Sequence, residues 1–210
     1  MPETHLPSQL VSFHGSPLTA YCLLLTGSEM IFTETTIGGA FIVDLKRMED
    51  ERGFFARSFC REEFQVHGLK TEIAQSNVSF NVKRGTLRGM HLQIAPCAEA
   101  KLVRCTRGAV HDVIIDLRPD TPTFCKWIAV RMTENDGRAV YIPEGVAHGF
   151  QTLDDNTELF YQMFTPYVPE WQRGVRWDDP TFRIVWPIPN PTISERDRNY
   201  PLFDRIRPLS

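Results

Sequence analysis

Short runs of β-forming residues, separated by turns rich in Gly, Pro and Asp, recur about every ten residues through most of the chain. Residues 31–55 are predicted to form a strand, a Gly-Gly interruption, a second strand and a polar turn. The further predicted strands are 72–80, 87–93, 101–106, 109–117, 126–133, 139–142, 149–153 and 158–164. Helical signals are confined to 61–67, closed by Gly68, and to a short turn beginning near Ser194, whose S-x-x-D pattern resembles a capping box. Many short strands with few helices between them predict an all-β sandwich or barrel rather than a sheet of βαβ units.

The 210 residues divide unevenly in charge and pattern. Residues 1–45 contain four acidic side chains and no Lys or Arg, so the net charge of −3 belongs to this stretch. We expect residues 1–29 to be a loosely ordered N-terminal extension, or an upstream start that the cell does not use. Residues 30–210 then form one domain, in which the Pro-rich tail from Pro180 is a strap over the barrel.

Charge and cysteine content exclude several classes of protein. The strong basic excess of nucleic-acid-binding proteins is missing. No stretch approaches the roughly 20 apolar residues of a membrane span, and the patch at 18–25 lacks the basic start of a secretory signal. The five cysteines include no C-x-x-C pair and no zinc-type spacing, which is typical of free thiols in a reducing compartment. The sequence therefore predicts a cytoplasmic protein that binds neither nucleic acid nor membrane.

Two strands carry polar side chains that permit a structural or a functional interpretation. Asp112 and Asp116 share one face of the strand at 109–117, and the default expectation for such carboxylates is a face turned to solvent. Tyr161 shares its face with Leu159 and Met163, which for a single tyrosine more often indicates a core or rim aromatic residue. A polar cavity is the alternative for both.

Two glycine-bounded segments are the most informative local motifs. Gly85 is followed after five residues by His91, and residues 137–148 read G-x5-P-x-G-x-x-H, ending at His148. These segments resemble the two motifs of the cupin jelly-roll barrel. Metal-binding cupins have H-x-H in the first motif, whereas Gln93 takes the place of the second histidine here. The remaining set of His91, Glu99 and His148 permits a three-ligand site, but an amide is a poor substitute for imidazole, so we expect a metal-free protein.

A longer set of segments resembles one family closely. DERGFFARSF (50–59), RGTLRGMHLQ (84–93), KLVRCTRGAVHDVIIDLRPDTPTF (101–124), IPEGVAHGF (142–150), ELFYQ (158–162) and ISERD (193–197) are similar, in this order, to the dTDP-4-dehydrorhamnose 3,5-epimerases. The similarity runs from about residue 30 to 203. It implies a cupin homodimer with exchanged N-terminal strands that acts, without a metal or other cofactor, on a nucleotide-linked 4-keto-6-deoxyhexose.

The same resemblance implies roles for four residues. The 4-keto group acidifies the hydrogens on adjacent carbons, so epimerisation needs a base, stabilisation of an enolate, and an acid on the opposite face of the ring. The family base corresponds to His91, oriented by Asp197; the acid corresponds to Tyr161, and Lys101 stands near the developing oxyanion. Each residue taken singly also has a purely structural interpretation. His91 could be a histidine packed in the barrel, Lys101 a surface charge at a strand start, and Asp197 a helix cap.

Substrate-binding residues are also implied by the resemblance. Arginines in the matching segments suit phosphate, polar side chains suit the sugar, and an aromatic side chain suits the nucleotide base. The expected residues are Arg52, Phe54, Gln75, Asn77, Arg88, Asp112, His148 and Arg196, with Tyr167 or Trp171 as alternatives to Phe54. Asp112 is expected to support the catalytic histidine or lysine. Residues 83–107 contain six basic residues against Glu99 alone, which suits an anionic sugar diphosphate.

Three positions depart from the family pattern. Arg57 and Gln172 replace glutamates, and Gln162 replaces a lysine, in segments that contact the nucleotide in relatives. The sequence therefore leaves two points open: whether the nucleotide of the substrate is dTDP or another one, and whether the enzyme epimerises C3, C5 or both. One alternative is a catalytically silent cupin that binds a sugar nucleotide; the intact set of His91, Lys101, Tyr161 and Asp197 disfavours it. The other is a metal-dependent cupin oxygenase, which Gln93 disfavours.

One geometric problem follows from these assignments. Strict alternation along a strand at 87–93 places Arg88 and His91 on opposite faces, yet both are expected in the site. A bend or bulge near Gly89 would reconcile them.

Overall fold

The computed structural model describes residues 29–204. The predicted N-terminal extension therefore lies, apart from Glu29, outside the described residues, as does the end of the tail from residue 205. Met30 is buried, and its N–H donates a hydrogen bond to the Glu63 carboxylate at 2.8 Å. Where the folded domain begins stays a prediction.

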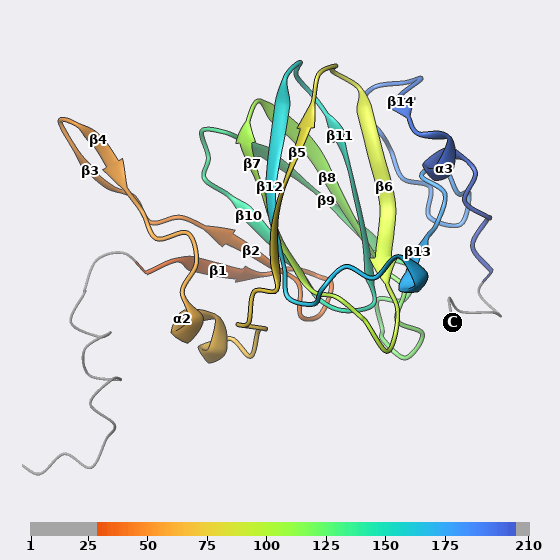
Figure 1. The fold of residues 1–210 in the computed structure, drawn as a ribbon, viewed down its shortest axis with the longest axis horizontal. Helices are drawn as coiled ribbons and strands as arrows, with labels where there is room; N and C mark the ends of the chain where they lie inside the picture. Colours follow the sequence, from red (N-terminus) through yellow and green to blue (C-terminus); the bar gives the residue numbers. More distant parts are fainter. Residues whose placement is uncertain (1–28, 205–210) are drawn as a thin grey trace, which may run out of the picture.

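Two antiparallel sheets face each other and form the body of the protein (Figure 1). The first contains, in spatial order, β1 (Ile31–Glu34), β2 (Phe41–Asp44), β10 (Ala139–Ile142), β7 (Lys101–Arg107), β12 (Thr157–Met163) and β5 (Gln75–Asn81). The second contains β13 (Gln172–Gly174), β6 (Thr86–Gln93), β11 (Val146–Thr152), β8 (Ala109–Asp116) and β9 (Trp127–Thr133), while β14 (Thr192–Ile193) pairs in parallel with β6. This arrangement is a jelly roll, so the predicted all-β fold is confirmed.

The main hydrophobic core lies between these sheets because alternate residues of each strand point inward. Val103 and Leu159 of the first sheet pack with Ile114 and Phe150 of the second. Val103, Leu159 and Phe150 also line a cavity at the side of the barrel where β5 and β6 lie, so the core ends at the floor of that cavity.

Most predicted elements match the observed ones within a few residues. The helical signals correspond to α2 (Arg61–Val66) and α3 (Glu195–Arg198), and Ser194 Oγ accepts a hydrogen bond from the Asp197 N–H at the start of α3. The predicted elements do not include β13, β14 or the 3₁₀ turn η1 (Pro169–Trp171). Segments this short pair through their backbones and have no room for a detectable hydrophobic period.

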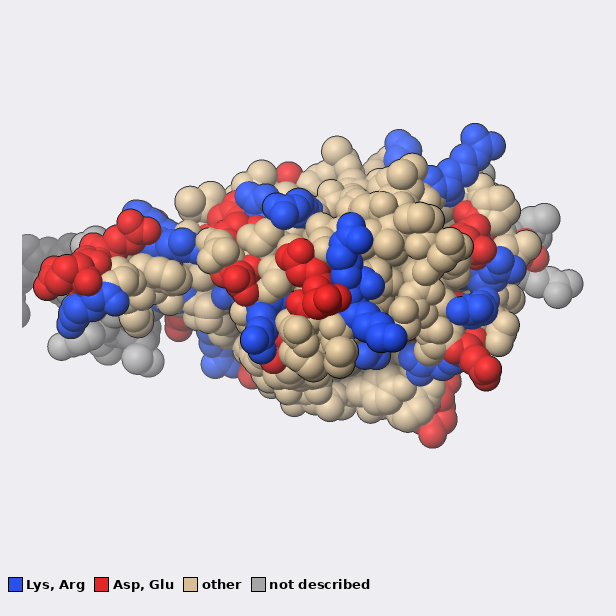
Figure 2. Space-filling model, turned by 90° about the horizontal axis from the view of Figure 1, so that it is seen from above, with Lys and Arg blue, Asp and Glu red and all other residues tan. Residues whose placement is uncertain are grey.

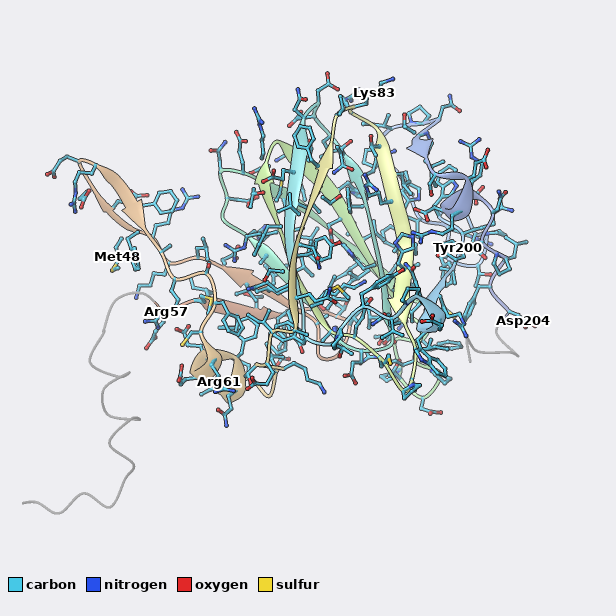
Figure 3. All side chains as sticks on the ribbon, in the orientation of Figure 1. Met48, Arg57, Arg61, Lys83, Tyr200 and Asp204 are labelled. Carbon is cyan, nitrogen blue, oxygen red and sulfur yellow. The ribbon has the colours of Figure 1, made fainter. Side chains whose placement is uncertain are left out.

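A short hairpin of β3 (Met48–Asp50) and β4 (Gly53–Phe55) projects from the barrel at the end where α2 lies (Figure 1). Its apolar side chains Met48, Phe54 and Phe55 are exposed, and Figure 3 shows Met48 far from Tyr200 at the opposite end. A hairpin of two three-residue strands buries too little surface to be held by itself.

The segment after β13 packs on the outer face of the second sheet. Val175 and Phe182 are buried against Val113 and Ile115, and the Trp127 indole N–H donates a hydrogen bond to the Phe182 carbonyl at 2.8 Å. This C-terminal segment then turns back toward β6, where it forms β14 and α3 (Figure 1).

The carboxylates of β8 do not face solvent, so the default expectation for Asp112 and Asp116 was wrong. Both side chains are buried. Asp116 accepts hydrogen bonds from the side chains of Arg118, Thr121 and Thr123, which lie on the turn after β8. A buried carboxylate is stable when it is hydrogen-bonded in this way, and the turn supplies the donors that the strand pattern alone does not reveal.

The bulge expected near Gly89 is confirmed. His91 pairs with His148 and Arg88 with Phe150, so two residues of β6 oppose the single Gly149 of β11. Gly89 has a φ of 134°, a conformation that favours glycine, and a Cβ placed on it would lie 2.5 Å from the Gly149 Cα. The extra residue turns both Arg88 and His91 into the cavity.

The replacement Gly89→Ala should therefore lower the free energy of unfolding by more than the cost of a positive φ at a non-glycine residue. Gly53 is the matched control, because its φ is 127° and a Cβ there would meet nothing within 4 Å. We expect Gly53→Ala to lower the free energy of unfolding by about 1–2 kcal/mol and Gly89→Ala to lower it by about 2 kcal/mol more, owing to the clash with β11. Urea denaturation of both variants measures the difference; equal losses would mean that the two strands separate easily at this point.

Candidate active site

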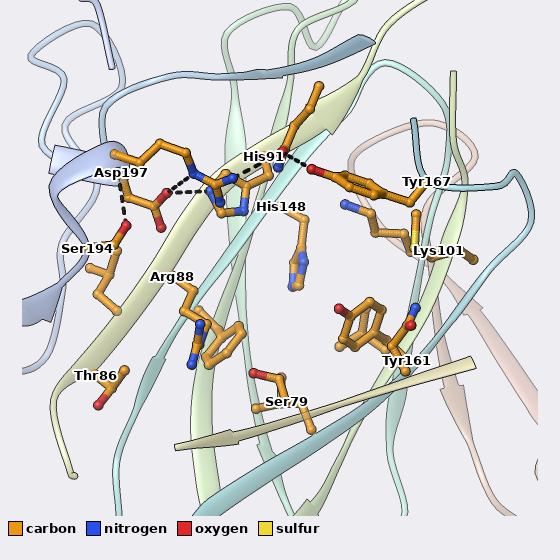
Figure 4. Close-up of a pocket in the computed structure, with 18 of the residues that line it drawn as sticks. Ser79, Thr86, Arg88, His91, Lys101, His148, Tyr161, Tyr167, Ser194 and Asp197 are labelled. Carbon is orange, nitrogen blue, oxygen red and sulfur yellow. Dashed lines mark hydrogen bonds and ion pairs between the residues drawn. The ribbon is translucent and has the colours of Figure 1, made fainter. Parts of the chain in front are cut away.

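The cavity at the side of the barrel has a volume of about 780 Å³ and is lined by β5, β6, β7, β11, β12 and the C-terminal segment (Figure 4). Nine of the twelve residues singled out in the sequence line it. They are Gln75, Asn77, Arg88, His91, Lys101, His148, Tyr161, Arg196 and Asp197. The other three, Arg52, Phe54 and Asp112, lie outside it.

His91 and Asp197 form a hydrogen-bonded pair, although 106 residues separate them in the sequence. His91 Nε2 lies 2.8 Å from Asp197 Oδ1, and the second carboxylate oxygen accepts a hydrogen bond from the Gly89 N–H at 3.2 Å. An ionised carboxylate only accepts hydrogen bonds, so Nε2 carries the proton and Nδ1 keeps a free lone pair. Asp197 therefore does not act only as a helix cap, because its side chain holds the imidazole of His91.

Burial sets the protonation of this pair. Burial is the main cause that lowers the pKa of His91, while the hydrogen bond and charge of Asp197 act in the opposite direction. Burial opposes the ionisation of Asp197, but its hydrogen bonds with His91 and Gly89 outweigh this, and the pKa of Asp197 is lowered. The pair is thus a neutral imidazole beside a carboxylate at neutral pH, and the imidazole is able to accept a proton.

Tyr161 and Lys101 line the same cavity from neighbouring strands of the first sheet (Figure 4). Burial, followed by the negative charge of Glu99, raises the pKa of Tyr161, so its hydroxyl keeps its proton at neutral pH. The Lys101 side chain is only 12% exposed, and its Nζ lies 2.5 Å from Glu99 Oε1. The alternative of a surface charge at a strand start therefore does not describe Lys101.

Asp112 supports a different histidine from the one expected. Its Oδ2 lies 2.7 Å from Nε2 of His148, and Asp112 is buried behind that residue. The cavity thus contains a second imidazole oriented by a carboxylate, and Asp112 itself does not face the cavity.

Polar side chains surround the cavity toward its rim. Arg88 Nε donates a hydrogen bond to Asn81 Oδ1 at 2.8 Å, and Gln172 Oε1 accepts from the Tyr167 hydroxyl at 2.6 Å and from Arg196 Nη1 at 3.2 Å. Four Ser and Thr residues that line the cavity were not among the predicted site residues: Ser79, Thr86, Thr192 and Ser194. Ser79 was detectable, because it shares a face of β5 with Gln75 and Asn77.

Gln93, at the place of the second cupin histidine, is bound to the backbone. Its amide donates to the carbonyls of Cys97 and Pro166 at 3.1 Å each and accepts from the Val168 N–H at 2.5 Å. Among residues 29–204, no group of three or more His, Cys, Asp or Glu side chains is arranged to hold a metal ion.

Arg52 and Phe54 lie on the β3–β4 hairpin rather than at the cavity of their own chain. Arg52 pairs with Asp50, and the Arg47 guanidinium lies 4.4 Å from the centre of the Phe54 ring. Arg57, one of the departures from the family pattern, pairs with Glu63 at 2.6 Å.

Positive charge relevant to a ligand is concentrated inside the cavity. Figure 2 shows acidic and basic side chains intermixed over the face seen from above. Arg88, Lys101 and Arg196 line the cavity, whereas Arg104, another base of the 83–107 surplus, donates a hydrogen bond to the Ser58 carbonyl. Glu99 and Asp197 also line the cavity and offset part of this charge, so three cationic against two anionic side chains favour an anionic ligand there. No helix among the described residues is long and apolar enough to cross a membrane.

Comparisons with known proteins show which family this chain resembles. The family model described as dTDP-4-dehydrorhamnose 3,5-epimerase matches residues 34–205. A dTDP-4-dehydrorhamnose 3,5-epimerase of Shigella flexneri is 42% identical over 167 residues, which cover 79% of this chain and 92% of the relative.

Solved structures give the same result. A dTDP-4-dehydrorhamnose 3,5-epimerase from Bacillus anthracis with TDP and PPi bound is 36% identical, with a TM-score of 0.81 over 83% of this chain and all of the other. ChmJ, a 3'-monoepimerase from Streptomyces bikiniensis in complex with dTDP-quinovose, is 35% identical, with a TM-score of 0.75 over 80% of this chain and 85% of the other. The predicted cupin jelly roll is thereby confirmed.

The His91–Asp197 pair predicts a specific NMR signature. We expect ring ¹⁵N spectra to show neutral His91 protonated at Nε2, with a pKa below 6.5. Asp197→Asn removes the negative charge that raises the pKa of His91 and leaves an amide that can either accept from or donate to Nε2, so this pKa should fall further and the tautomer should no longer be fixed. Asp178→Asn, on the same C-terminal segment but paired with Arg176, should leave both unchanged. An Nδ1-protonated ring in the parent protein would contradict the assignment.

Proposed function

The chain belongs to the dTDP-4-dehydrorhamnose 3,5-epimerase family and is an isomerase, and from this premise we propose that it inverts C3 and C5 of a dTDP-linked 4-keto-6-deoxyhexose. One observation carries the proposal. A neutral histidine with a fixed tautomer opens onto the same cavity as a protonated tyrosine and a buried lysine. These are the base, the acid and the cation that enolisation next to a ketone requires.

In the proposed reaction, Nδ1 of His91 removes the hydrogen from the carbon next to the ketone. The electron pair of the broken C–H bond forms a C=C bond, and the ketone oxygen becomes an enolate oxygen that the Lys101 ammonium stabilises. Tyr161 then gives its hydroxyl proton to the opposite face of the same carbon, and the ketone re-forms. The imidazolium and the tyrosinate that remain exchange protons with water, so the net reaction is an inversion.

The cationic side chains of the cavity suit the diphosphate of the substrate. Arg196 comes from α3, and its Nε lies 3.3 Å from Asp197 Oδ1, whereas Arg88 comes from the bulge of β6 and its Nε donates a hydrogen bond to Asn81 Oδ1. Guanidinium binds phosphate oxygens in a bidentate manner. The Bacillus anthracis relative was solved with TDP and PPi, which supports dTDP as the nucleotide.

We further propose a homodimer with exchanged N-terminal strands, in which the hairpin of one protomer completes the cavity of the other. Two observations support it. Met48, Phe54 and Phe55 are exposed on the hairpin, and Val78 and Phe80 are exposed on the outer face of β5, whose inner face lines the cavity. Exposed apolar patches of this kind mark interaction surfaces. Arg52 and Phe54 would then contact substrate in the partner's cavity.

A single-centre epimerase is the alternative function. ChmJ, described as a 3'-monoepimerase, is 35% identical to this chain, so similarity of this degree is compatible with inversion at one carbon. Gln172, one of the departures, touches both Tyr167 and Arg196 at the rim, where it influences how the sugar turns between the two deprotonations.

Deuterium exchange tests the reaction and counts the centres. In D₂O with the dTDP-4-keto-6-deoxyglucose substrate, we expect ¹H NMR to show exchange at both C3 and C5. His91→Asn should lower the exchange rate by a factor on the order of 10³ while leaving binding of dTDP-sugar intact. Tyr161→Phe should still exchange but should form inverted product slowly, because it keeps the base and loses the acid.

Exchange at one carbon alone would establish the monoepimerase. No exchange at either carbon, together with tight binding of the sugar nucleotide, would replace the epimerase with a binding protein. The exposed Glu170→Gln variant, which lies outside the cavity, serves as the control for handling and folding.

Complementation tests the contribution of the hairpin. Arg52→Ala and His91→Asn homodimers should each be nearly inactive, since each lacks one part of both sites. After unfolding and refolding of an equal mixture, about half of the dimers are mixed, and each contains one complete site. We therefore expect about a quarter of the parent activity to return. If Arg52 instead served the cavity of its own chain, neither cavity of a mixed dimer would be complete, and no activity would return. A monomeric protein would likewise show no recovery after mixing.

A further inference from the structure

Glu99 is a buried carboxylate that the proposed reaction does not use. It precedes β7 by two residues, and its side chain lines the cavity on the same side as Lys101. The backbone on both sides is anchored, because the Phe164 N–H donates to the Ala100 carbonyl at 3.0 Å and the Thr165 hydroxyl to the Ala98 carbonyl at 2.9 Å. The position of the carboxylate is therefore fixed by β12 and the loop after it.

The two oxygens of Glu99 have different surroundings. Oε1 lies 2.5 Å from Lys101 Nζ, whereas Oε2 is buried and receives no hydrogen bond from any residue within 29–204. The side chain as a whole is only 5% exposed. Leaving a buried polar atom without a donor costs about 1–3 kcal/mol, and more for a charged group. Because Glu99 lines the cavity, a molecule bound there is in a position to supply a donor for Oε2.

The location of Glu99 identifies which part of a substrate meets this oxygen. Its ion-pair partner is Lys101, which the proposed reaction places at the ketone oxygen. Its charge also contributes to the raised pKa of Tyr161, which places Glu99 near the proposed acid. The carboxylate thus stands at the reacting end of the sugar rather than at the diphosphate end.

We propose that Glu99 is a specificity-determining residue that accepts a hydrogen bond from the hydroxyl next to the ketone, at C3 of the sugar. The inference rests on the proposed function, because that function supplies the ketone. A ketone with a neighbouring hydroxyl presents an acceptor and a donor side by side. Lys101 Nζ is held at 2.5 Å by Oε1 of Glu99, and Oε2 of the same carboxylate has no donor in the described part of the chain, so the pair offers a donor and an acceptor in the complementary order.

This arrangement discriminates between sugars through Oε2 of Glu99, the carboxylate oxygen that has no donor within residues 29–204. A site built to accept a hydrogen bond from a hydroxyl rejects an analogue that lacks it, because the buried acceptor is then left without a partner. The 3-hydroxyl also remains on the carbon that loses its hydrogen at C3. Glu99 would hold that carbon in one position while the proton is removed.

A cycle with two substrates and two enzymes tests the proposal. The substrates are the dTDP-linked 4-keto-6-deoxy sugar and its 3-deoxy analogue, and the readout is deuterium exchange at C5, which both can undergo. We expect the parent enzyme to have a kcat/KM at least tenfold lower with the analogue. Glu99→Ala should lose activity with the hydroxylated sugar and show nearly equal kcat/KM for both. Glu99→Gln, whose amide oxygen still accepts, should retain part of the discrimination.

The result that overturns the proposal is a Glu99→Ala variant that loses the same factor with both substrates, since a structural effect through Lys101 would act on both alike. Glu170→Gln is the matched control, because it removes an exposed carboxylate outside the cavity and should leave the ratio of the two substrates unchanged. Thermal unfolding of each variant checks that the fold is retained.

Binding measurements separate this proposal from the proposed function. If the parent enzyme gives no exchange, the proposed reaction is wrong. Calorimetry then tests Glu99 alone, by measuring how tightly His91→Asn, with and without Glu99→Ala, binds the two sugar nucleotides. A preference for the hydroxylated sugar nucleotide that disappears with Glu99→Ala supports the proposal. An unchanged preference overturns it.

Discussion

The close approach of β6 and β11 at Gly89 and Gly149 is the constraint on which the rest of the site depends. Because two residues of β6 oppose one of β11 there, Arg88 and His91 face the same cavity instead of opposite sides of a sheet. The same bulge leaves the Gly89 N–H free of a regular ladder partner, and Asp197 accepts it through the oxygen that His91 does not use. One carboxylate thus ties the irregular backbone to the imidazole, so the shape of the strand and the orientation of the histidine are fixed together.

Burial controls the chemistry of the cavity as much as the identity of its residues does. It lowers the pKa of His91 and raises that of Tyr161, so both groups stay uncharged at neutral pH. The charged groups are held beside partners: Asp197 by His91, and Lys101 by Glu99. A site with a neutral base, a neutral acid and compensated charges accepts an anionic ligand without first creating an unpaired buried charge.

Much of the barrel could be predicted from the sequence, because two-residue periodicity and turn residues report directly on strands. The bulge was also accessible, since a glycine separates two side chains that are needed on one side. Other features depend on contacts between distant segments. Asp112 and Asp116 are buried because His148 and the turn after β8 supply donors, and Glu99 is informative only through the unequal surroundings of its two oxygens. No strand pattern contains that information, and the pairing of β13 and β14 with β6 is likewise a property of the assembled backbone.

The C-terminal segment has a consequence for the order in which the protein becomes competent. All strands from β1 to β12 precede it, yet Asp197 comes from its helix α3, and the segment that leads to α3 packs on the outside of the barrel through Val175 and Phe182. During synthesis the two sheets are therefore available to form before the histidine is aligned. A chain that ended before α3 would keep every strand from β1 to β12 and would lack the carboxylate that orients the imidazole.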